Sequence, residues 1–373
     1  MVNSLAKKHH RGLAALVFAA ALAGAFWRAP NPGAASFAAP PAASPSPLPA
    51  VFSSETLAAA EAAEPCLTEL PDGRLAAAWS GLAETDETAR VIRYSVLDKN
   101  GWRLPQPVAS RESTAAGSFA NEQEIGNPLL YAEGSWLHLW YTSRSGWAAR
   151  AIQHSVSTDG GRSWSKPVAL RTAPLASDTL LRAAPVALAD GGLGLAISSQ
   201  LLAATGAYLR LAPTGEIVDK QRLPLMQPGL QPAVAVLDAQ HALALLHHAA
   251  DGSGQLQAAV TANGGQSWQA APALPIANPD TPVALLRLQS GRLLLAGNPG
   301  SGRGTLALWL SADGGQTWQA SRTLESADDG AAEFTAPALL LGRDTRIHLV
   351  YAWRRQGIKH LAFSEAWLDG EQP

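Results

Sequence analysis

The sequence predicts an all-β protein, a six-bladed β-propeller, and two recurring elements carry this prediction. The first is an apolar hairpin whose turn recurs roughly every 50 to 60 residues after residue 50. The second is a box of the form S-x-D-x-G-x-[ST]-W that follows several of the hairpins. A hairpin and a boxed hairpin together make four strands, and six such units make a closed propeller.

Each hairpin consists of two β-favouring or apolar runs joined by a turn that contains Gly or Asp. The six hairpins span residues 66–79, 128–141, 185–198, 232–246, 282–297 and 337–353. The last repeat ends after three strands, near Ser364. We therefore expect residues 51–60 to supply the missing strand and to close the ring.

The boxes span residues 157–164, 261–268 and 311–318, and decayed copies stand at 213–215 and 98–102. Their chemistry is structural: an Asp or Asn side chain caps its own turn, the glycines adopt positive φ, and the Trp ring packs on the blade. Each loop has too few oxygen ligands for calcium. We assign this role to Asp159, Trp164, Asn263, Trp268, Asp313 and Trp318.

Composition excludes several classes of function. The chain has 373 residues, of which 47% are hydrophobic, enough for a large core. Lys and Arg number 28 against 30 Asp and Glu, so no basic excess supports nucleic-acid binding. The single cysteine, Cys66, excludes an intramolecular disulfide and a cysteine-based metal cluster. No phosphate loop or dinucleotide fingerprint is present, and we expect neither a metal nor a cofactor.

The N-terminus has the features of an export signal. A basic stretch at residues 7–11 precedes an apolar run at 13–27, which is short for a membrane span, and 23–25 offers a small-x-small cleavage site. Two outcomes stay open, cleavage or retention as an inner-membrane anchor. We expect a signal or anchor at 1–28, an unpacked Pro/Ala-rich linker at 29–50 and a propeller at 51–373, monomeric and exported to the periplasm.

Strand direction alternates within a blade, so the boxes and hairpin turns share one face of the propeller. The links between blades and between second and third strands share the other face, where we expect the site. These links mix carboxylates, guanidinium groups and amides, a set that suits a sugar bearing a carboxylate. Among them are Asn127, Gln231, Asn278 and Asp280, which we expect to bind substrate.

The boxes at 157–164 and 311–318, within a six-fold repeat, resemble the BNR or Asp-box repeats of sialidases over residues 60 to 365. Further similar stretches are 69–75, 126–128, 230–232, 278–280 and 351–360. The resemblance implies three arginines on the substrate carboxylate, a tyrosine nucleophile assisted by a glutamate, and an aspartate acid/base. This chain departs from the pattern, since Ala63 stands where the first arginine would be and Phe334 where the tyrosine would be.

Three hypotheses follow. In the first, the protein is a sialidase-type glycoside hydrolase for an acidic sugar, with Glu333 as base or nucleophile and Glu84 or Asp86 as acid. Arg182, Arg354 and Arg355 would hold the substrate carboxylate. In the second, it is a non-catalytic propeller that binds a glycan or an envelope partner. In the third, it degrades another acidic polysaccharide with a different acid/base pair, and His247 and His248 would then matter.

Overall fold

The computed structural model describes residues 34–46, 48–84, 86, 89–118, 121–146, 150–170, 172, 178–199, 203–248, 254–278, 280–300, 302–327 and 332–370. The chain divides into two units, Met1–Ala34 and Ala35–Pro373, and the second contains every element described below. The expected signal or anchor at 1–28 lies outside the described residues. Within the described residues, no helix has the length and hydropathy needed to span a bilayer.

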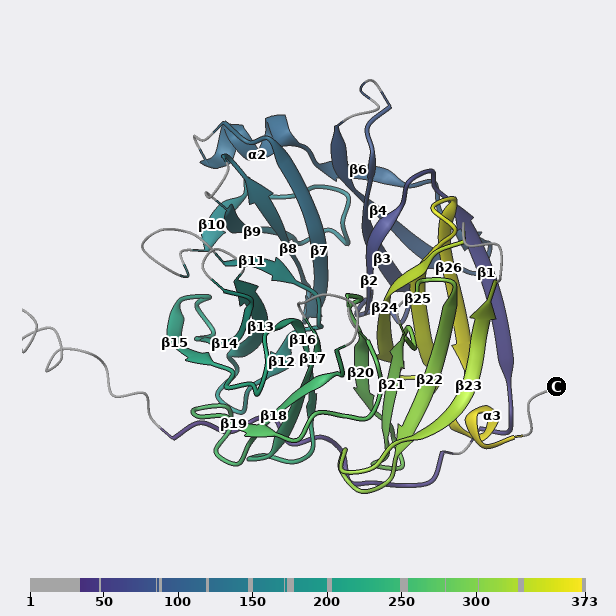
Figure 1. Cartoon of the computed structure of the whole chain (residues 1–373). Helices are drawn as coiled ribbons and strands as arrows, with labels where there is room; N and C mark the ends of the chain where they lie inside the picture. Colours follow the sequence, from purple (N-terminus) through teal and green to yellow (C-terminus); the bar gives the residue numbers. More distant parts are fainter. Residues whose placement is uncertain are drawn as a thin grey trace, which may run out of the picture. The chain divides into compact units, whose positions relative to one another are not determined.

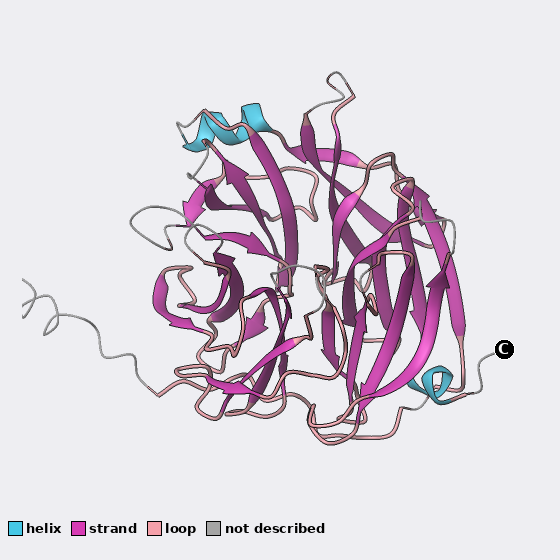
Figure 2. Ribbon diagram, viewed as in Figure 1, coloured by secondary structure: helices cyan, strands magenta, loops and turns pink. Residues whose placement is uncertain are grey.

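Ala35–Pro373 forms a six-bladed propeller, which confirms the predicted fold (Figures 1 and 2). Six antiparallel sheets each begin near the central axis, and the innermost strands contact one another in ring order. Blade I contains β2 (Ala63–Glu69), β3 (Leu75–Leu82), β4 (Arg90–Asp98), β5 (Gly101–Trp102) and β6 (Gln106–Ala109). Blade II contains β7 (Glu124–Glu133), β8 (Trp136–Arg144), β9 (Arg150–Ser157) and β10 (Val168–Leu170).

The remaining blades repeat this order from the axis outward. Blade III contains β11 (Asp178–Leu181), β12 (Val186–Ala187), β13 (Leu193–Ser199), β14 (Thr205–Leu211) and β15 (Ile217–Arg222). Blade IV contains β16 (Gly229–Val236), β17 (Ala242–His248), β18 (Gln257–Thr261) and β19 (Gln269–Ala271). Blade V contains β20 (Ala284–Arg287), β21 (Leu293–Gly297), β22 (Thr305–Ser311) and β23 (Gln319–Ser326). Blade VI contains β24 (Phe334–Leu341), β25 (Ile347–Trp353), β26 (Gly357–Phe363) and β1 (Phe52–Ala58).

The ring closes with a strand from the N-terminal side, as the sequence predicts. β1 pairs antiparallel with β26, from Phe52 opposite Phe363 to Ala58 opposite Gly357. The last blade therefore joins both ends of the propeller chain. Because β1 completes blade VI as its outer strand, the pairing fastens the two ends of the ring together.

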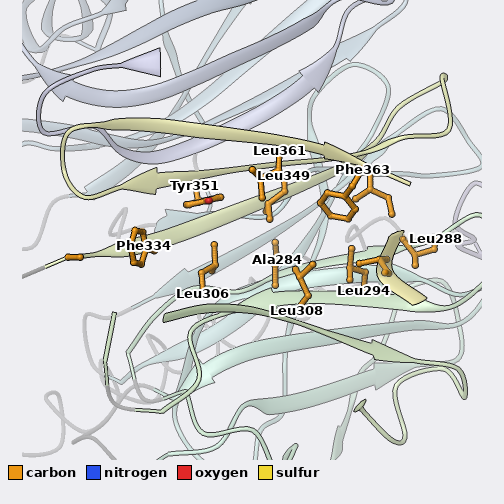
Figure 3. Packing of buried hydrophobic residues seen from close by; sticks show 14 residues of the cluster. Ala284, Leu288, Leu294, Leu306, Leu308, Phe334, Leu349, Tyr351, Leu361 and Phe363 are labelled. Carbon is orange, nitrogen blue, oxygen red and sulfur yellow. The ribbon is translucent and has the colours of Figure 1, made fainter. Parts of the chain in front are cut away.

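Apolar residues between neighbouring blades form the core. Figure 3 shows Leu349 and Leu361 of blade VI facing Leu294 and Leu308 of blade V, and all four are buried. The second strand of a blade has neighbours on both faces, so it reads as a continuous apolar run rather than an alternating one. This is why 75–79 and 242–246 look so uniformly apolar in the sequence.

Four inner strands share one irregularity, a non-glycine residue with positive φ directly before a proline. These residues are Glu64, Asn127, Gln231 and Ala336, with φ between 49° and 56°. The left-handed conformation disfavours residues with a Cβ by roughly 1–2 kcal/mol, and each strand ladder shifts register at this point. Strain of this kind gathers at functional sites and marks a ring of positions near the axis.

At three of these bulges, a side chain of the preceding blade forms a hydrogen bond with the backbone at or near the bulge. The Asn127 N–H donates to Glu64 Oε2 (2.7 Å), and the Gln231 N–H donates to Ser198 Oγ (2.6 Å). In the same way, Asn298 Nδ2 donates to the Phe334 carbonyl (2.7 Å). Since a buried backbone group needs a partner, these contacts fix both the bulge and the spacing of the blades.

The expectation of an unpacked linker at 29–50 is wrong for residues 35–46. This segment crosses the Asp-box face of the propeller and is called the strap below (Figure 1, purple). Phe37 is buried, its N–H donates to the Ala239 carbonyl (2.8 Å), and its ring packs edge-on against Tyr208. One aromatic residue and a few backbone hydrogen bonds suffice to dock a segment whose composition suggests no packing.

Two short helices were not expected from the sequence. α2 (Arg111–Ser118) follows blade I, and α3 (Glu365–Asp369) follows β26 (Figure 2). Ser110 and Ser364 accept hydrogen bonds from backbone N–H groups of the first turns, as helix-capping serines do. Both helices lie at the rim and not at the axis.

Candidate functional site

The Asp boxes stabilise their own turns through hydrogen bonds and pack against the neighbouring blade. Asp159 Oδ1 accepts hydrogen bonds from the Arg162 and Ser163 N–H groups (2.9 and 3.0 Å), and the Ser163 hydroxyl donates to Oδ2. These bonds hold the pKa of Asp159 well below its usual range. Gly161, at φ +88°, lies so close to Tyr94 of blade I that a Cβ would stand 2.4 Å from its ring.

The box of blade V repeats this geometry with Asp313. Its Oδ1 accepts from the Gln316 and Thr317 N–H groups, and the Trp318 Nε1–H donates to the Gly315 carbonyl (3.1 Å), as Trp164 does to Gly161. In blade IV, Asn263 accepts from the Ser267 N–H, while Trp268 packs on Tyr208 of blade III. The carboxylates of these boxes are engaged in their own turns.

The opposite face, called the site face below, has a polar network around the axis. Gln231 of blade IV lies between Asn127 of blade II and His247: Nε2 donates to Asn127 Oδ1 (3.4 Å), and Oε1 lies 3.1 Å from His247 Nε2. Burial lowers the pKa of His247, which favours the neutral ring. The network joins two strained bulge residues that are 104 positions apart in the chain.

A polar cavity of about 70 Å³ lies at the site face between blades I and II and is called the arginine pocket below. Its charged side chains are Glu64, Arg90, Glu124, Arg144 and Arg150, and it also contains Asn127 and Thr142. Glu64 comes from the bulge of an inner strand and Glu124 from the start of the next inner strand. The three arginines come from the end of a second strand and the starts of two third strands. All of these meet at one end of the blades.

The arginines of this pocket differ in how they are engaged. Arg144 Nε donates to Glu124 Oε2 (3.0 Å), and Arg90 Nη2 donates to the Glu61 carbonyl (3.1 Å). The Arg150 side chain has no hydrogen bond or ion pair with any residue that the structure describes. Glu64 Oε2 accepts from the Ser80 hydroxyl (3.0 Å) in addition to the Asn127 N–H. The pocket thus has cationic capacity beyond its own carboxylate contacts.

Arg182 lies deeper than a substrate-binding residue would. It is 4% exposed, and it extends from blade III across the axis to blades I and VI. Its Nη2 donates to the carbonyls of Pro65 (3.1 Å), Pro337 (3.3 Å) and Ala336. These contacts make Arg182 a tie between blades, beneath the arginine pocket and not part of it.

Glu333 stands in a separate charged group at the junction of blades V and VI. Its Oε2 lies 4.0 Å from Arg303 Nη1, and Arg303 Nη2 lies 3.4 Å from Asp280 Oδ2. Arg355 is paired with Glu61 (2.6 Å), and the Arg354 guanidinium lies over the rings of Phe334 and Trp353. The predicted residues Glu333, Asp280, Arg354 and Arg355 therefore share one sector of the site face.

The predicted acids Glu84 and Asp86 contact other partners. Glu84 is exposed and lies 3.5 Å from Arg93 of β4, whereas Asp86 lies 3.2 Å from Arg111 of α2. Neither lines the arginine pocket. Glu87, a third acid of this loop, lies outside the described residues. Phe334 is fully buried in the blade V–VI core, so no hydroxyl stands there for a nucleophile.

Asn278, predicted to bind substrate, is buried and holds its own loop. Its Oδ1 accepts from both the N–H and the hydroxyl of Thr281 (3.1 and 2.8 Å). Its backbone carbonyl accepts from the His248 N–H. This leaves Asn127 and Gln231 as the two predicted amides that face the axis network.

Two charged residues of this pocket, Glu64 and Arg150, were not among the site residues that the sequence indicated. Glu64 occurs in the stretch where the family arginine is replaced, and its position directly before Pro65 repeats Asn127-Pro128 and Gln231-Pro232. That recurring pre-proline position was an available signal for Glu64. Arg150 begins a third strand and has no such pattern.

A family model described as a BNR repeat-like domain matches residues 73–349, about three quarters of the chain. The chain belongs to this family. A search of curated proteins gave no match. The family match covers four complete hairpins and all three boxes, so it rests on the same repeats that position the site.

Solved structures agree on the fold. A Hadza microbial sialidase, Hz136, superimposes with a TM-score of 0.66 at 16% identity, and the alignment covers 82% of this chain and 66% of that one. A protein of unknown function from Dyadobacter fermentans gives 0.65 at 14% identity, covering 84% and 99%. The α-L-arabinanase of Penicillium chrysogenum, complexed with arabinobiose, gives 0.59 at 15% identity, covering 88% and 100%. At these identities the similarity shows a fold shared with glycoside hydrolases.

Proposed function

We propose that this protein binds an acidic sugar at the arginine pocket on the site face of its propeller. The observation that carries the proposal is the convergence of Arg90, Arg144 and Arg150 on one cavity, with Arg150 unpaired among the described residues. Guanidinium groups bind carboxylates in a two-pronged geometry. The Asn127 amide and the Thr142 hydroxyl supply the neutral hydrogen-bonding groups that sugar hydroxyls need.

The pocket favours binding more directly than it favours cleavage. Glycoside hydrolysis needs a proton donor together with a nucleophile or a base. Both carboxylates of the pocket are engaged by the protein itself, since Glu64 accepts a hydrogen bond from the Asn127 N–H and Glu124 accepts one from Arg144 Nε. Phe334 and Ala63 replace the family's tyrosine and first arginine. Binding is therefore the first function proposed.

Cleavage of a sialic-acid-like or other acidic sugar is the second candidate. It is favoured by Glu333, a partly exposed carboxylate on the same face with Arg303 at 4.0 Å. In this mechanism Glu333 acts as base or nucleophile and replaces the missing tyrosine. We further propose export to the periplasm through residues 1–28, cleaved or retained, because these residues combine a basic stretch with an apolar run.

The binding proposal is tested by calorimetric titration of the full-length protein with sialyllactose and with lactose. We expect sialyllactose to bind at least tenfold more tightly, and Arg150→Met to remove that preference, because a hydrogen bond to a charged group contributes about 1.5–3 kcal/mol. Arg162→Met, an exposed arginine on the Asp-box face, is the matched control. Equal affinity for both sugars, or an unaffected Arg150→Met variant, contradicts the proposal.

Release of methylumbelliferone from its sialic-acid glycoside between pH 4 and 8 tests cleavage separately. Turnover that Glu333→Gln abolishes, in a variant that still binds sialyllactose, would establish the hydrolase. Binding without turnover would leave the protein as a glycan-binding propeller.

A further inference from the structure

A second cavity occupies the centre of the propeller, on the far side of Arg182 from the site face. Its volume is about 290 Å³, and its walls come from the parts of the inner strands that follow the bulges. Aliphatic side chains line these walls, among them Leu67, Leu129, Val186, Val234 and Val283. Ala38 and Pro40 of the strap line the end at the Asp-box face. No residue of the arginine pocket lines this cavity.

Arg182 lines this cavity at the end away from the strap and brings a positive charge to it. Its Nη2 is used by three backbone carbonyls, but Nε and Nη1 are buried and have no hydrogen-bond partner among the described residues. Glu64 attracts the guanidinium without a hydrogen bond, since Glu64 Oε2 is engaged by Ser80 and Asn127. A buried charge with unpaired donors is unfavourable unless an anion compensates it.

Cys66 also lines the cavity near Arg182, but its side chain is not the anion that would compensate the Arg182 charge. The thiol is fully buried, and burial raises its pKa to about 11, so it is neutral at physiological pH. The other walls are aliphatic except near the strap, where Arg287 also lines the cavity and its Nη1 donates to the Pro41 carbonyl (3.3 Å). Because Arg287 is engaged by the strap and Arg182 has unpaired donors, the cavity favours a molecule with an anionic group at the Arg182 end and a hydrocarbon chain along the aliphatic walls.

We infer that this cavity is a second binding site, which takes an unbranched aliphatic monocarboxylate with its carboxylate toward Arg182 and its tail toward the strap. Apolar pockets with a few converging polar groups are the usual form of small-molecule sites. The carboxylate would pair with the donors left by the backbone contacts, and the tail would displace water from the aliphatic walls. The site is independent of the sugar site proposed above.

Titration calorimetry of the full-length protein with hexanoate, octanoate and decanoate tests this inference. We expect one saturable site, with affinity rising about fourfold per added methylene, the factor that about 0.8 kcal/mol for each buried CH₂ implies. Octan-1-ol has the same tail without the charge and should bind at least tenfold more weakly than octanoate. The alcohol measures the contribution of the carboxylate without mutating Arg182, a residue that ties three blades.

Ala184→Leu tests the location. Ala184 lines the cavity and is exposed, so the larger side chain has room to enter it, and we expect octanoate affinity to fall at least tenfold. Ala270→Leu, in outer strand β19, is the matched control and should bind as the wild type does. Absence of saturable binding, octan-1-ol binding as tightly as octanoate, or an unaffected Ala184→Leu variant would overturn the inference.

Discussion

Phe37→Ala should destabilise the propeller although Phe37 precedes the first strand by fifteen positions. Phe37 is 1% exposed, contacts the ring of Tyr208 at 6.4 Å between centroids, and belongs to the core cluster of blades III and IV. Truncation of a buried Phe to Ala costs about 3–5 kcal/mol through lost transfer energy and the cavity left behind. We expect about 3 kcal/mol, because the strap can detach and limit the loss.

Detachment at Phe37 would also break the three backbone hydrogen bonds that surround it in the strap. Phe37 and Ala38 donate to the carbonyls of Ala239 and Ala187, and the Ala189 N–H donates to Ser36. These bonds should exchange with water in the variant. Limited proteolysis should therefore cut within residues 35–46 of Phe37→Ala much faster than in the wild type.

Urea unfolding followed by tryptophan fluorescence measures the loss of stability. Phe52→Ala is the control, since Phe52 is 47% exposed and contacts mainly the Trp367 ring at 4.8 Å. We expect the control to lose about 1 kcal/mol. If Phe37→Ala unfolds at the wild-type midpoint, or no earlier than Phe52→Ala, then the strap is not part of the folded core and the reasoning is refuted.

Three further predictions follow from contacts described above or from buried rings. Asp313→Ala should lower the melting temperature, whereas Asp313→Asn should retain most of it, because an amide oxygen still accepts the backbone N–H groups that Asp313 holds; differential scanning calorimetry of both compares them. Burial lowers the pKa of His154 to about 4 and of His360 to about 3, so the unfolded chain binds protons first as the pH falls. The stability from each histidine should be complete above about pH 6.5 and should fall by about 3 kcal/mol between pH 6.5 and pH 4, as measured by urea unfolding at both pH values. Their replacement by Gln should flatten that dependence, and an unchanged slope would contradict it. Tyr351→Phe should lower the free energy of unfolding by about 1–2 kcal/mol, because the Tyr351 hydroxyl donates to Glu325 Oε1 (2.6 Å). Tyr208→Phe should be neutral or stabilising, because the buried Tyr208 hydroxyl has no partner among the described residues. The reverse order of stability in urea unfolding would show these assignments to be wrong.

The repeats were readable because each is a local structure. An Asp box closes hydrogen bonds within five residues, and a hairpin turn within four, so residue spacing alone predicts them. Counting six hairpins predicted six blades, and the three-stranded last repeat predicted that 51–60 would close the ring. The recurring residue before proline could have marked Glu64 in the same way.

The site depends on contacts that spacing does not encode. Asn127 and Gln231 meet because four residues in different blades turn inward at equivalent bulges. Arg182 extends from blade III to carbonyls 117 and 154 positions away, so a residue expected to hold a ligand instead ties the blades. Glu84 and Asp86 belong to the loop that the sequence indicated, but the arginines beside them take up their carboxylates.

The sequence by itself determined the class of fold, the number of blades, the closing strand and the face on which polar links gather. All of these follow from periodic patterns of apolar, turn and box residues. Only the tertiary structure decided that the strap packs on the Asp-box face, that three arginines converge between blades I and II, and that Arg182 separates that pocket from an apolar cavity. The physical reason is that closing a ring brings residues from opposite blades together at one axis. Their separation along the chain does not predict which of them will be in contact there.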